Sequence, residues 1–276
     1  MNRLTGLRRR SEETQHRFAA ERAYHYELAA PETVIQSVLR VHDQASKPSC
    51  VGQAVSSCEE SIVGRWASAV DLWTDAKRRQ GSAGNPLDGT DSEHAIESLR
   101  MRGCSPYVTG EDTRSTDEDV QLAELGQELA ADDARQDPTA EHKTLTSNRT
   151  GQAVDALMRG LGVVHGGAVN DAYQALRRDE VIEPADVMGS DGHERRIFGY
   201  VKERGLFLEL NSWGATWSGV TLLKGFIVPA PFTFGTIVVP AGPLTNALVL
   251  SGCAWLSPEA LALSWDADAI RIVVTA

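Results

Sequence analysis

The chain has few cysteines for its length: four in 276 residues, at positions 50, 58, 104 and 253. So sparse a set is unlike the disulfide framework of a small secreted domain, and we expect reduced thiols in a cytosol-like compartment. Whether Cys58 pairs with Cys104 stays open at this stage. No Cys/His spacing is typical of a zinc site, so we expect neither a metal nor a cofactor.

The sequence also lacks a long apolar run and an excess of positive charge. No stretch approaches the roughly 18 apolar residues of a membrane span, and the first ten residues hold no apolar core of a secretory signal. With 27 Lys and Arg against 38 Asp and Glu, the formal net charge is −11. Such a charge disfavours nonspecific nucleic-acid binding. We therefore expect no membrane span and no nucleic-acid partner, and a location in the cytoplasm or within a protein assembly such as a virus particle.

Helical periodicity lies in the first half of the chain and strand-like runs lie in the second. Apolar or small residues recur every three or four positions from Cys50 to Trp73, which predicts a helix with one buried face. Pro48 and Ser49 suit its start. A capping-box pattern at 90–93 predicts a second helix ending near Gly103, and strand-like runs follow from residue 162. This order predicts an α+β fold of two lobes, the first helical and the second antiparallel β.

The composition suggests three segments. Residues 1–29 are polar and charged and form a predicted arm. Residues 30–240 form the main domain, with a helical lobe over about 45–110, an acidic, alanine-rich connection over 111–141, and a β lobe over about 150–240. Residues 241–276 are apolar, and we expect a β extension that packs on the domain or on a partner.

One set of separated residues has the chemistry of acyl transfer to a cysteine. A thiol at a helix N-terminus, as predicted for Cys50, is favoured as the nucleophilic thiolate. His193 could act as base and then as acid for the leaving amine. Asn211 could hold the other imidazole nitrogen. Gln44, six residues before Cys50, could donate to the developing oxyanion together with the Cys50 backbone N–H.

These residues lie in motifs that resemble the papain family of cysteine peptidases, in its prokaryotic or viral type without a long propeptide. The resemblance covers roughly residues 30–235 and rests on order and spacing across three separated sites. The matching segments are Asp43-Gln44 with Ser49-Cys50, Gly192-His193 with Gly199-Tyr200, and Asn211-Ser212-Trp213-Gly214 with Trp217. The resemblance implies a two-lobed fold whose β lobe is barrel-like, with the site in the cleft between the lobes.

The same resemblance implies roles for the matching residues. Cys50, His193, Asn211 and Gln44 take the catalytic positions. Ser49, Trp213 and Trp217 are supporting residues, and Trp213 is placed to shield the Asn–His hydrogen bond from water.

The sequence departs from the family around these motifs. Lys47, Pro48 and Val51 replace a cysteine, a glycine and an aromatic residue, so the family's disulfide beside the nucleophile is absent. The strand after the base, normally apolar, carries Glu194-Arg195-Arg196. Three charged residues on a core strand are costly unless they are solvated or paired. The strand would then lie at an edge, or a partner would cover it, or the base would be His165 instead; the spacing to Asn211 favours His193.

The sequence therefore predicts a peptidase that hydrolyses peptide or amide bonds of a polypeptide substrate through a Cys50 thioester. Two alternatives belong to other classes. One is an inactive structural protein that reuses the fold within a larger assembly and makes contacts through residues 1–27 and 241–276. The other is a deamidase or transglutaminase-type acyl transferase, because these enzymes use the same Cys–His pair.

Overall fold

The computed structural model describes residue 7 and residues 31–81, 89–107, 109–110, 140–146 and 148–272. Except for Leu7, the predicted arm over 1–29 lies outside the described residues, and so does nearly all of the acidic connection. Within the described part of the chain, no helix is both long and apolar enough to cross a membrane.

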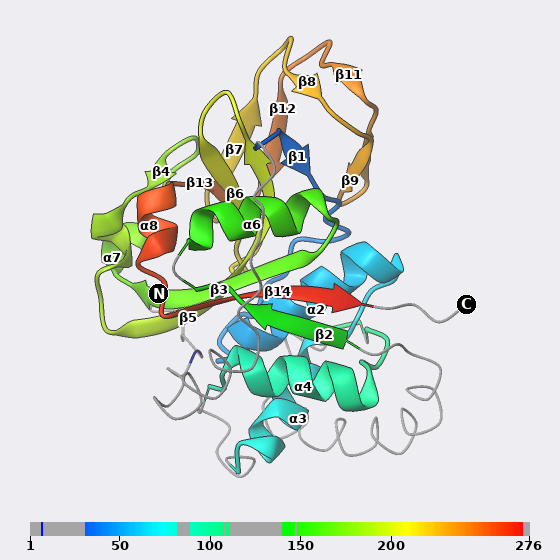
Figure 1. Ribbon diagram of the computed structural model, residues 1–276, viewed down its shortest axis with the longest axis vertical. Helices are drawn as coiled ribbons and strands as arrows, with labels where there is room; N and C mark the ends of the chain where they lie inside the picture. The colour runs from blue at the N-terminus through cyan, green and yellow to red at the C-terminus, as the bar shows by residue number, and fades with distance from the viewer. Residues whose placement is uncertain are drawn as a thin grey trace.

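Three helices from the first half of the chain lie together on one side of the molecule in Figure 1: α2 (Cys50–Val63), α3 (Ala69–Arg79) and α4 (Ser92–Arg102). The helical pattern predicted from Cys50 to Trp73 is thus two helices. Gly64 ends α2 in the left-handed region at φ 79°, which glycine adopts without steric cost. The Ser68 hydroxyl then accepts from the Asp71 N–H and caps α3, because the first N–H groups of a helix have no acceptor within the helix.

The main sheet has eight strands and is mostly antiparallel. Its order is β2 (Ala140–Thr144), β14 (Asp266–Ile272), β3 (Gly162–Val169), β5 (Asp191–Val201), β6 (Leu206–Leu210), β13 (Cys253–Leu256) and β4 (Val181–Ile182), with β1 (Val34–Ile35) also pairing with β5. The path runs from β2 to β4 without closing, so the described strands form no closed barrel. The α+β, two-lobed fold class is confirmed in this open form.

Shorter elements complete the second lobe. Three two-stranded sheets pair β7 (Gly219–Leu222) with β12 (Leu248–Ser251), β8 (Ile227–Val228) with β11 (Gly242–Pro243), and β9 (Phe232–Phe234) with β10 (Ile237–Val239). The helices here are α6 (Arg149–Met158), α7 (Asp171–Gln174), α8 (Pro258–Ala262) and the short 3₁₀ helix η3 (Pro184–Val187). Figure 1 shows α6 lying across β3 and β5, on the side of the sheet away from α3 and α4.

Two strands from residues 241–272, β13 and β14, lie inside the main sheet and not at its edges. Strand β13 lies between β6 and β4, and β14 lies between β3 and β2. Ile270 on β14 packs in the same apolar cluster as Cys50 and Val55 of α2. These strands are therefore integral to the sheet that faces the helices.

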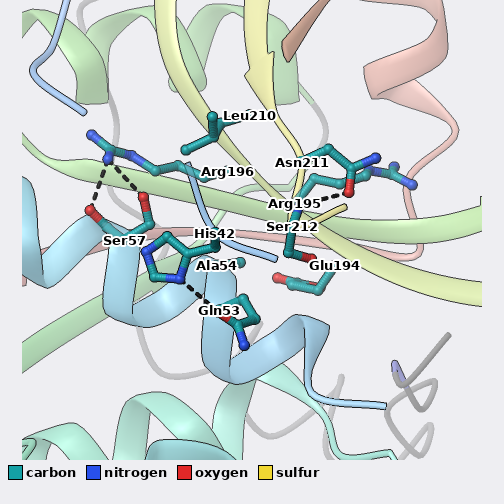
Figure 2. A pocket seen from close by; sticks show the side chains of 10 residues that line it. All are labelled: His42, Gln53, Ala54, Ser57, Glu194, Arg195, Arg196, Leu210, Asn211 and Ser212. Atoms are coloured by element: carbon teal, nitrogen blue, oxygen red, sulfur yellow. Dashed lines mark hydrogen bonds between the residues drawn. The ribbon is translucent and has the colours of Figure 1, made fainter. Parts of the chain in front are cut away.

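The charged run on β5 lies at the centre of the sheet, because β3 pairs with one side of the strand and β6 with the other. An edge position for this strand is therefore wrong. Arg195 and Arg196 are each 1% exposed, and their side chains leave the strand in different directions in Figure 2. Burial of each charge is compensated by partners within the chain, on opposite faces of the sheet.

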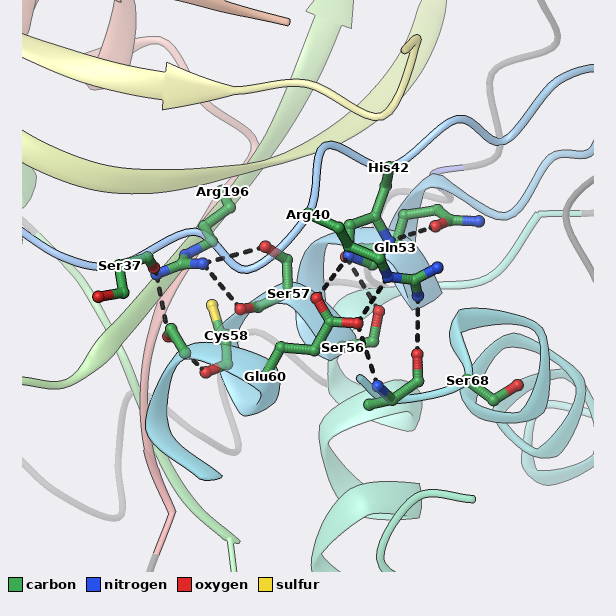
Figure 3. Close-up of polar contacts among 12 residues, drawn as sticks. Ser37, Arg40, His42, Gln53, Ser56, Ser57, Cys58, Glu60, Ser68 and Arg196 are labelled. Atoms are coloured by element: carbon green, nitrogen blue, oxygen red, sulfur yellow. Dashed lines mark hydrogen bonds and ion pairs between the residues drawn. The ribbon is translucent and has the colours of Figure 1, made fainter. Parts of the chain in front are cut away.

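Arg196 points toward α2 and is held by several oxygen acceptors (Figure 3). Its Nη1 donates to the Ser57 carbonyl at 2.7 Å and to the Ser57 hydroxyl at 3.0 Å. Its Nη2 donates to Gln36 Oε1, to the Ser37 carbonyl and to the Ser61 hydroxyl. Neutral acceptors thus replace the water that a buried guanidinium loses.

Glu59 of α2 offers a test of how burial affects stability. It is 1% exposed, and the nearest cation in an ion pair is Arg65, whose Nη2 lies 4.0 Å from Glu59 Oε1. Burial raises the pKa of Glu59 to about 7, and the Arg65 charge offsets this only in part. The folded state therefore keeps a proton that the unfolded state loses above about pH 4.5, so stability falls as pH rises from about 4.5 to 7.

We expect Glu59→Gln to leave stability nearly unchanged at pH 4 and to raise it by up to about 3 kcal/mol at pH 8. The neutral amide removes the cost of ionising a buried carboxyl. Urea unfolding at both pH values measures the effect. Glu97→Gln on the exposed face of α4 is the control and should show no such pH dependence. A gain of equal size at both pH values would contradict the expectation.

Candidate active site

Cys50 is the first residue of α2 and is fully buried. The backbone N–H of Glu194 donates to Cys50 Sγ at 3.5 Å, so the thiol lies against the segment of β5 that carries His193. At the start of a 14-residue helix the sulfur also meets the positive end of the helix dipole, which favours an anion. Ser49 occupies the N-cap position without a side-chain capping bond; its hydroxyl accepts from Gln53 Nε2 at 3.3 Å instead.

The other three cysteines are buried and form no disulfide, so the Cys58–Cys104 pairing that the sequence leaves open is not formed. Burial raises the pKa of Cys58 to about 11 and that of Cys253 still further. Cys104 donates its thiol proton to the Ser68 carbonyl at 3.2 Å. Cys58 and Cys253 thus remain thiols at neutral pH and are poor nucleophiles.

His193 lies on β5, and the protein engages one face of its ring and one of its nitrogens. Its Nε2 is 2.8 Å from Asn211 Oδ1, and the Trp213 ring stacks on it at 4.5 Å between centroids and an angle of 23°. Nδ1 has no hydrogen-bond partner among the described residues. Burial, and then the Arg195 charge, lower the pKa of His193 to about 3, although the Asn211 bond opposes the shift. The imidazole is therefore neutral at rest, with Nδ1 available to accept a proton.

Aromatic rings enclose the Asn211–His193 pair. Trp213 follows Asn211 by two residues, and Trp217 packs edge-on against Trp213 with 5.8 Å between centroids. Tyr173 of α7 contacts both tryptophan rings. Such a cover keeps water from competing for the amide–imidazole bond.

Gln44 is fully buried and ties two loops of the site together. Its Nε2 donates to the Lys47 carbonyl at 2.8 Å, and its Oε1 accepts from the Ser212 hydroxyl at 2.6 Å. The Gln44 backbone N–H also donates to the Ser212 carbonyl at 2.8 Å. The loop before the nucleophile is thereby attached to the loop that follows Asn211.

A second set of polar residues holds the nucleophile helix in place (Figures 2 and 3). His42 Nδ1 is 2.6 Å from Gln53 Oε1, and His42 Nε2 is 3.1 Å from Glu60 Oε2. Arg40 Nε also pairs with Glu60, at 2.7 Å. These contacts fix α2 against the segment that leads to Gln44. Sequence reasoning gave His42 no role, because one histidine beside a motif carries no partner pattern.

His165, the competing base, belongs to a different cluster. Its Nε2 lies 2.8 Å from Glu209 Oε2, and its Nδ1 lies 3.0 Å from the Ser264 hydroxyl. Burial, and then the Arg195 charge, lower the pKa of His165, so the ring is neutral and donates from Nε2 to the carboxylate. Both of its nitrogens have hydrogen-bond partners, whereas His193 Nδ1 has none among the described residues.

Leu7 is the one described residue of the predicted arm, and it lies against the site. Its N–H donates to the Gly192 carbonyl at 3.1 Å, and it forms a parallel bridge with Thr90. The side chain is 7% exposed and packs at Gly166, where the carboxylates of Glu194 and Asp266 also converge. Leu7 therefore covers the strand immediately before His193.

We expect Leu7→Asp to raise the rate at which iodoacetamide alkylates Cys50. A third carboxylate next to Glu194 and Asp266 would be costly to bury, so residue 7 should leave this position and expose the site. The Cys50 adduct is followed by peptide mass spectrometry over time. Leu7→Met, which keeps an apolar side chain of similar size, is the control and should retain the original rate. An unchanged rate in Leu7→Asp would contradict the covering role.

Comparison with solved structures places this geometry in a known fold. The chain matches xylellain, a cysteine protease from Xylella fastidiosa, at a TM-score of 0.69 with 17% sequence identity, covering 100% of this chain and 99% of that one. It matches procathepsin L 3 of Tenebrio molitor larval midgut at a TM-score of 0.55 with 16% identity, covering 99% and 76%. The chain has the papain-like fold.

Other papain-like structures agree. The Carica candamarcensis cysteine protease CMS1MS2, solved with E-64, matches at a TM-score of 0.55 with 14% identity, covering 90% of this chain and 100% of that one. No protein-family model matches the sequence, and no curated protein matches it either. Sequence identities of 14–17% with these three structures show a shared fold and no more.

Proposed function

We propose that the protein is a cysteine peptidase that hydrolyses peptide or amide bonds through a thioester on Cys50. The observation that carries the proposal is the arrangement around His193. One ring nitrogen is held by Asn211 at 2.8 Å, and the other has no hydrogen-bond partner in the described structure. The thiol of Cys50 accepts from the next residue of the same strand, at 3.5 Å. A base oriented by a third group beside a nucleophile is the arrangement that acyl transfer requires.

The reaction would proceed in two halves. His193 Nδ1 takes the Cys50 proton as the sulfur attacks the carbonyl carbon, and the imidazolium then gives that proton to the leaving amine as the C–N bond breaks. Water attacks the thioester with His193 again as base, and the C–S bond breaks to release the acid and restore the thiol. Asn211 holds the ring throughout. Gln44 Nε2 and the Cys50 backbone N–H would stabilise the oxyanion of each tetrahedral intermediate.

Active-site labelling tests the proposal. The full chain and its Leu7→Asp variant are treated with iodoacetamide and, separately, with E-64, and adducts are located by mass spectrometry. We expect preferential labelling of Cys50, and we expect His193→Ala to slow it. Labelling of another cysteine, or labelling that does not depend on His193, would overturn the proposal.

Product analysis then identifies the reaction. A denatured protein substrate such as casein is incubated with the protein, with and without an added primary amine. New peptide termini indicate hydrolysis. Incorporation of the amine indicates acyl transfer by the same residues. A reactive Cys50 without either product would assign the chain to a binding role instead.

A further inference from the structure

A chain of hydrogen bonds continues from Asn211 away from His193. Asn211 Nδ2 donates to the Tyr173 hydroxyl at 3.1 Å, and that hydroxyl donates to Glu209 Oε1 at 2.6 Å. All three side chains are at most 1% exposed. Tyr173 comes from α7, and Glu209 comes from β6, two residues before Asn211. The family motifs in the sequence include neither Tyr173 nor Glu209.

The carboxylate at the end of this chain is ionised. Burial alone would raise the pKa of Glu209, but the Arg195 charge and the hydrogen bonds from His165 and Tyr173 outweigh it, so the pKa lies below its usual value. Arg195 Nε is 3.3 Å from Glu209 Oε2, and the guanidinium also lies over the Tyr173 ring. An ionised carboxylate only accepts hydrogen bonds, so the proton between Tyr173 and Glu209 belongs to Tyr173.

The Tyr173–Glu209 hydrogen bond fixes the donor and the acceptor in each of the remaining hydrogen bonds. Because the Tyr173 proton points to Glu209, its oxygen is an acceptor toward Asn211 and must face the amide Nδ2. The Asn211 Oδ1 is then turned toward His193 Nε2, and the Ser212 N–H donates to the same oxygen at 2.6 Å. An amide turned by 180° would set two acceptors against each other at Tyr173, whose proton goes to Glu209, and two donors against each other at the Ser212 N–H. Each clash would leave a buried polar group unsatisfied.

The orientation of the Asn211 amide determines which nitrogen of His193 carries the proton. An acceptor opposite Nε2 keeps the proton of the neutral His193 ring on Nε2 and leaves Nδ1 unprotonated. We propose that Tyr173 and Glu209 are positioning residues of the site, which set the Asn211 amide and through it the tautomer of His193. The inference rests on the proposed function for its catalytic meaning, but the tautomer itself is a property of the resting protein.

Imidazole nitrogen shifts measure this property directly. The full chain is labelled with ¹⁵N-histidine, and the His193 signals are assigned by their loss in His193→Ala. We expect the Nε2–H tautomer in the wild type and a mixture of tautomers in Tyr173→Phe, which lacks the hydroxyl. Iodoacetamide alkylation of Cys50 should slow by roughly 3- to 10-fold in the same variant, the range for one net hydrogen bond. Tyr200→Phe, which removes a hydroxyl outside this network, should change neither.

The Asn211→Asp variant tests whether Tyr173 acts through the Asn211 amide. A carboxylate presents an acceptor in either orientation, so the tyrosine no longer has an amide to direct. Adding Tyr173→Phe to Asn211→Asp should leave the His193 tautomer unchanged, so that the two substitutions are non-additive. An additive effect would point to packing alone and would overturn the inference.

Glu209→Gln is a second test of the inference in case Tyr173→Phe does not fold. Circular dichroism shows whether each variant is folded. A glutamine can donate as well as accept, so the Tyr173 proton is free to turn toward Asn211, and mixed tautomers are again expected. A pure Nε2–H tautomer in both variants would overturn the inference. These results differ from a failure of the proposed function, in which the wild type shows the Nε2–H tautomer but yields no hydrolysis product.

Discussion

Cys50→Ala is expected to abolish hydrolysis of the casein substrate, lowering kcat by at least about 10⁴-fold. The substitution removes the sulfur that forms the thioester in the proposed mechanism, and alanine offers no nucleophile in its place. Because alanine is small and suits a helix start, the fold and the Asn211–His193 bond should persist. Initial rates at saturating substrate measure the loss.

The matched control for Cys50→Ala is Cys253→Ala. Cys253 is equally buried but belongs to the apolar cluster between β6, β7 and β12, and burial keeps it a thiol. Its substitution should leave kcat unchanged. If Cys50→Ala retained the wild-type rate, hydrolysis would have to arise from other residues and the thioester mechanism would fail.

The second large effect concerns stability. Arg195→Met is expected to lower the free energy of unfolding by about 3–5 kcal/mol, because it leaves the Glu209 carboxylate buried without its cation. Arg195→Met with Glu209→Gln should lose much less than Arg195→Met alone, since a neutral amide can still bond to Tyr173 and His165. Urea unfolding at pH 7 gives both values.

An exposed ion pair serves as the comparison for this experiment. Arg100 pairs with Glu97 at 3.0 Å on α4, with both side chains more than 40% exposed, so Arg100→Met should change stability little. Equal losses for Arg195→Met and Arg100→Met would show that burial of the central pair has no special role. A double variant as unstable as Arg195→Met would contradict the charge argument.

The start of the nucleophile helix was predictable because it is a local feature. Pro48, Ser49 and the apolar period after Cys50 all act within a few residues, and α2 begins at Cys50 as the pattern indicates. The end of that helix was not predicted, because the apolar period continues past Gly64 into α3. A glycine in the left-handed region interrupts the helix without disturbing the pattern.

The charged run on β5 shows the limit of a sequence argument. The two buried arginines of this run do have partners. These come from β6 and α2, at sequence separations of 14 residues for Arg195 with Glu209 and 139 for Arg196 with Ser57. No local signal links such residues, so the central position of the strand could be read only from the sheet.

The sequence by itself determined the fold class and the order of the residues that the family resemblance selects: Gln44, Cys50, His193 and Asn211. Spacing within each motif is preserved because turns and helix starts depend on near neighbours. Only the tertiary structure decided which groups surround them. It brought Leu7 against Gly192, placed β13 and β14 within the sheet, and set Tyr173 and Glu209 behind Asn211. These contacts depend on strand pairing and burial across the whole chain, which no short pattern encodes.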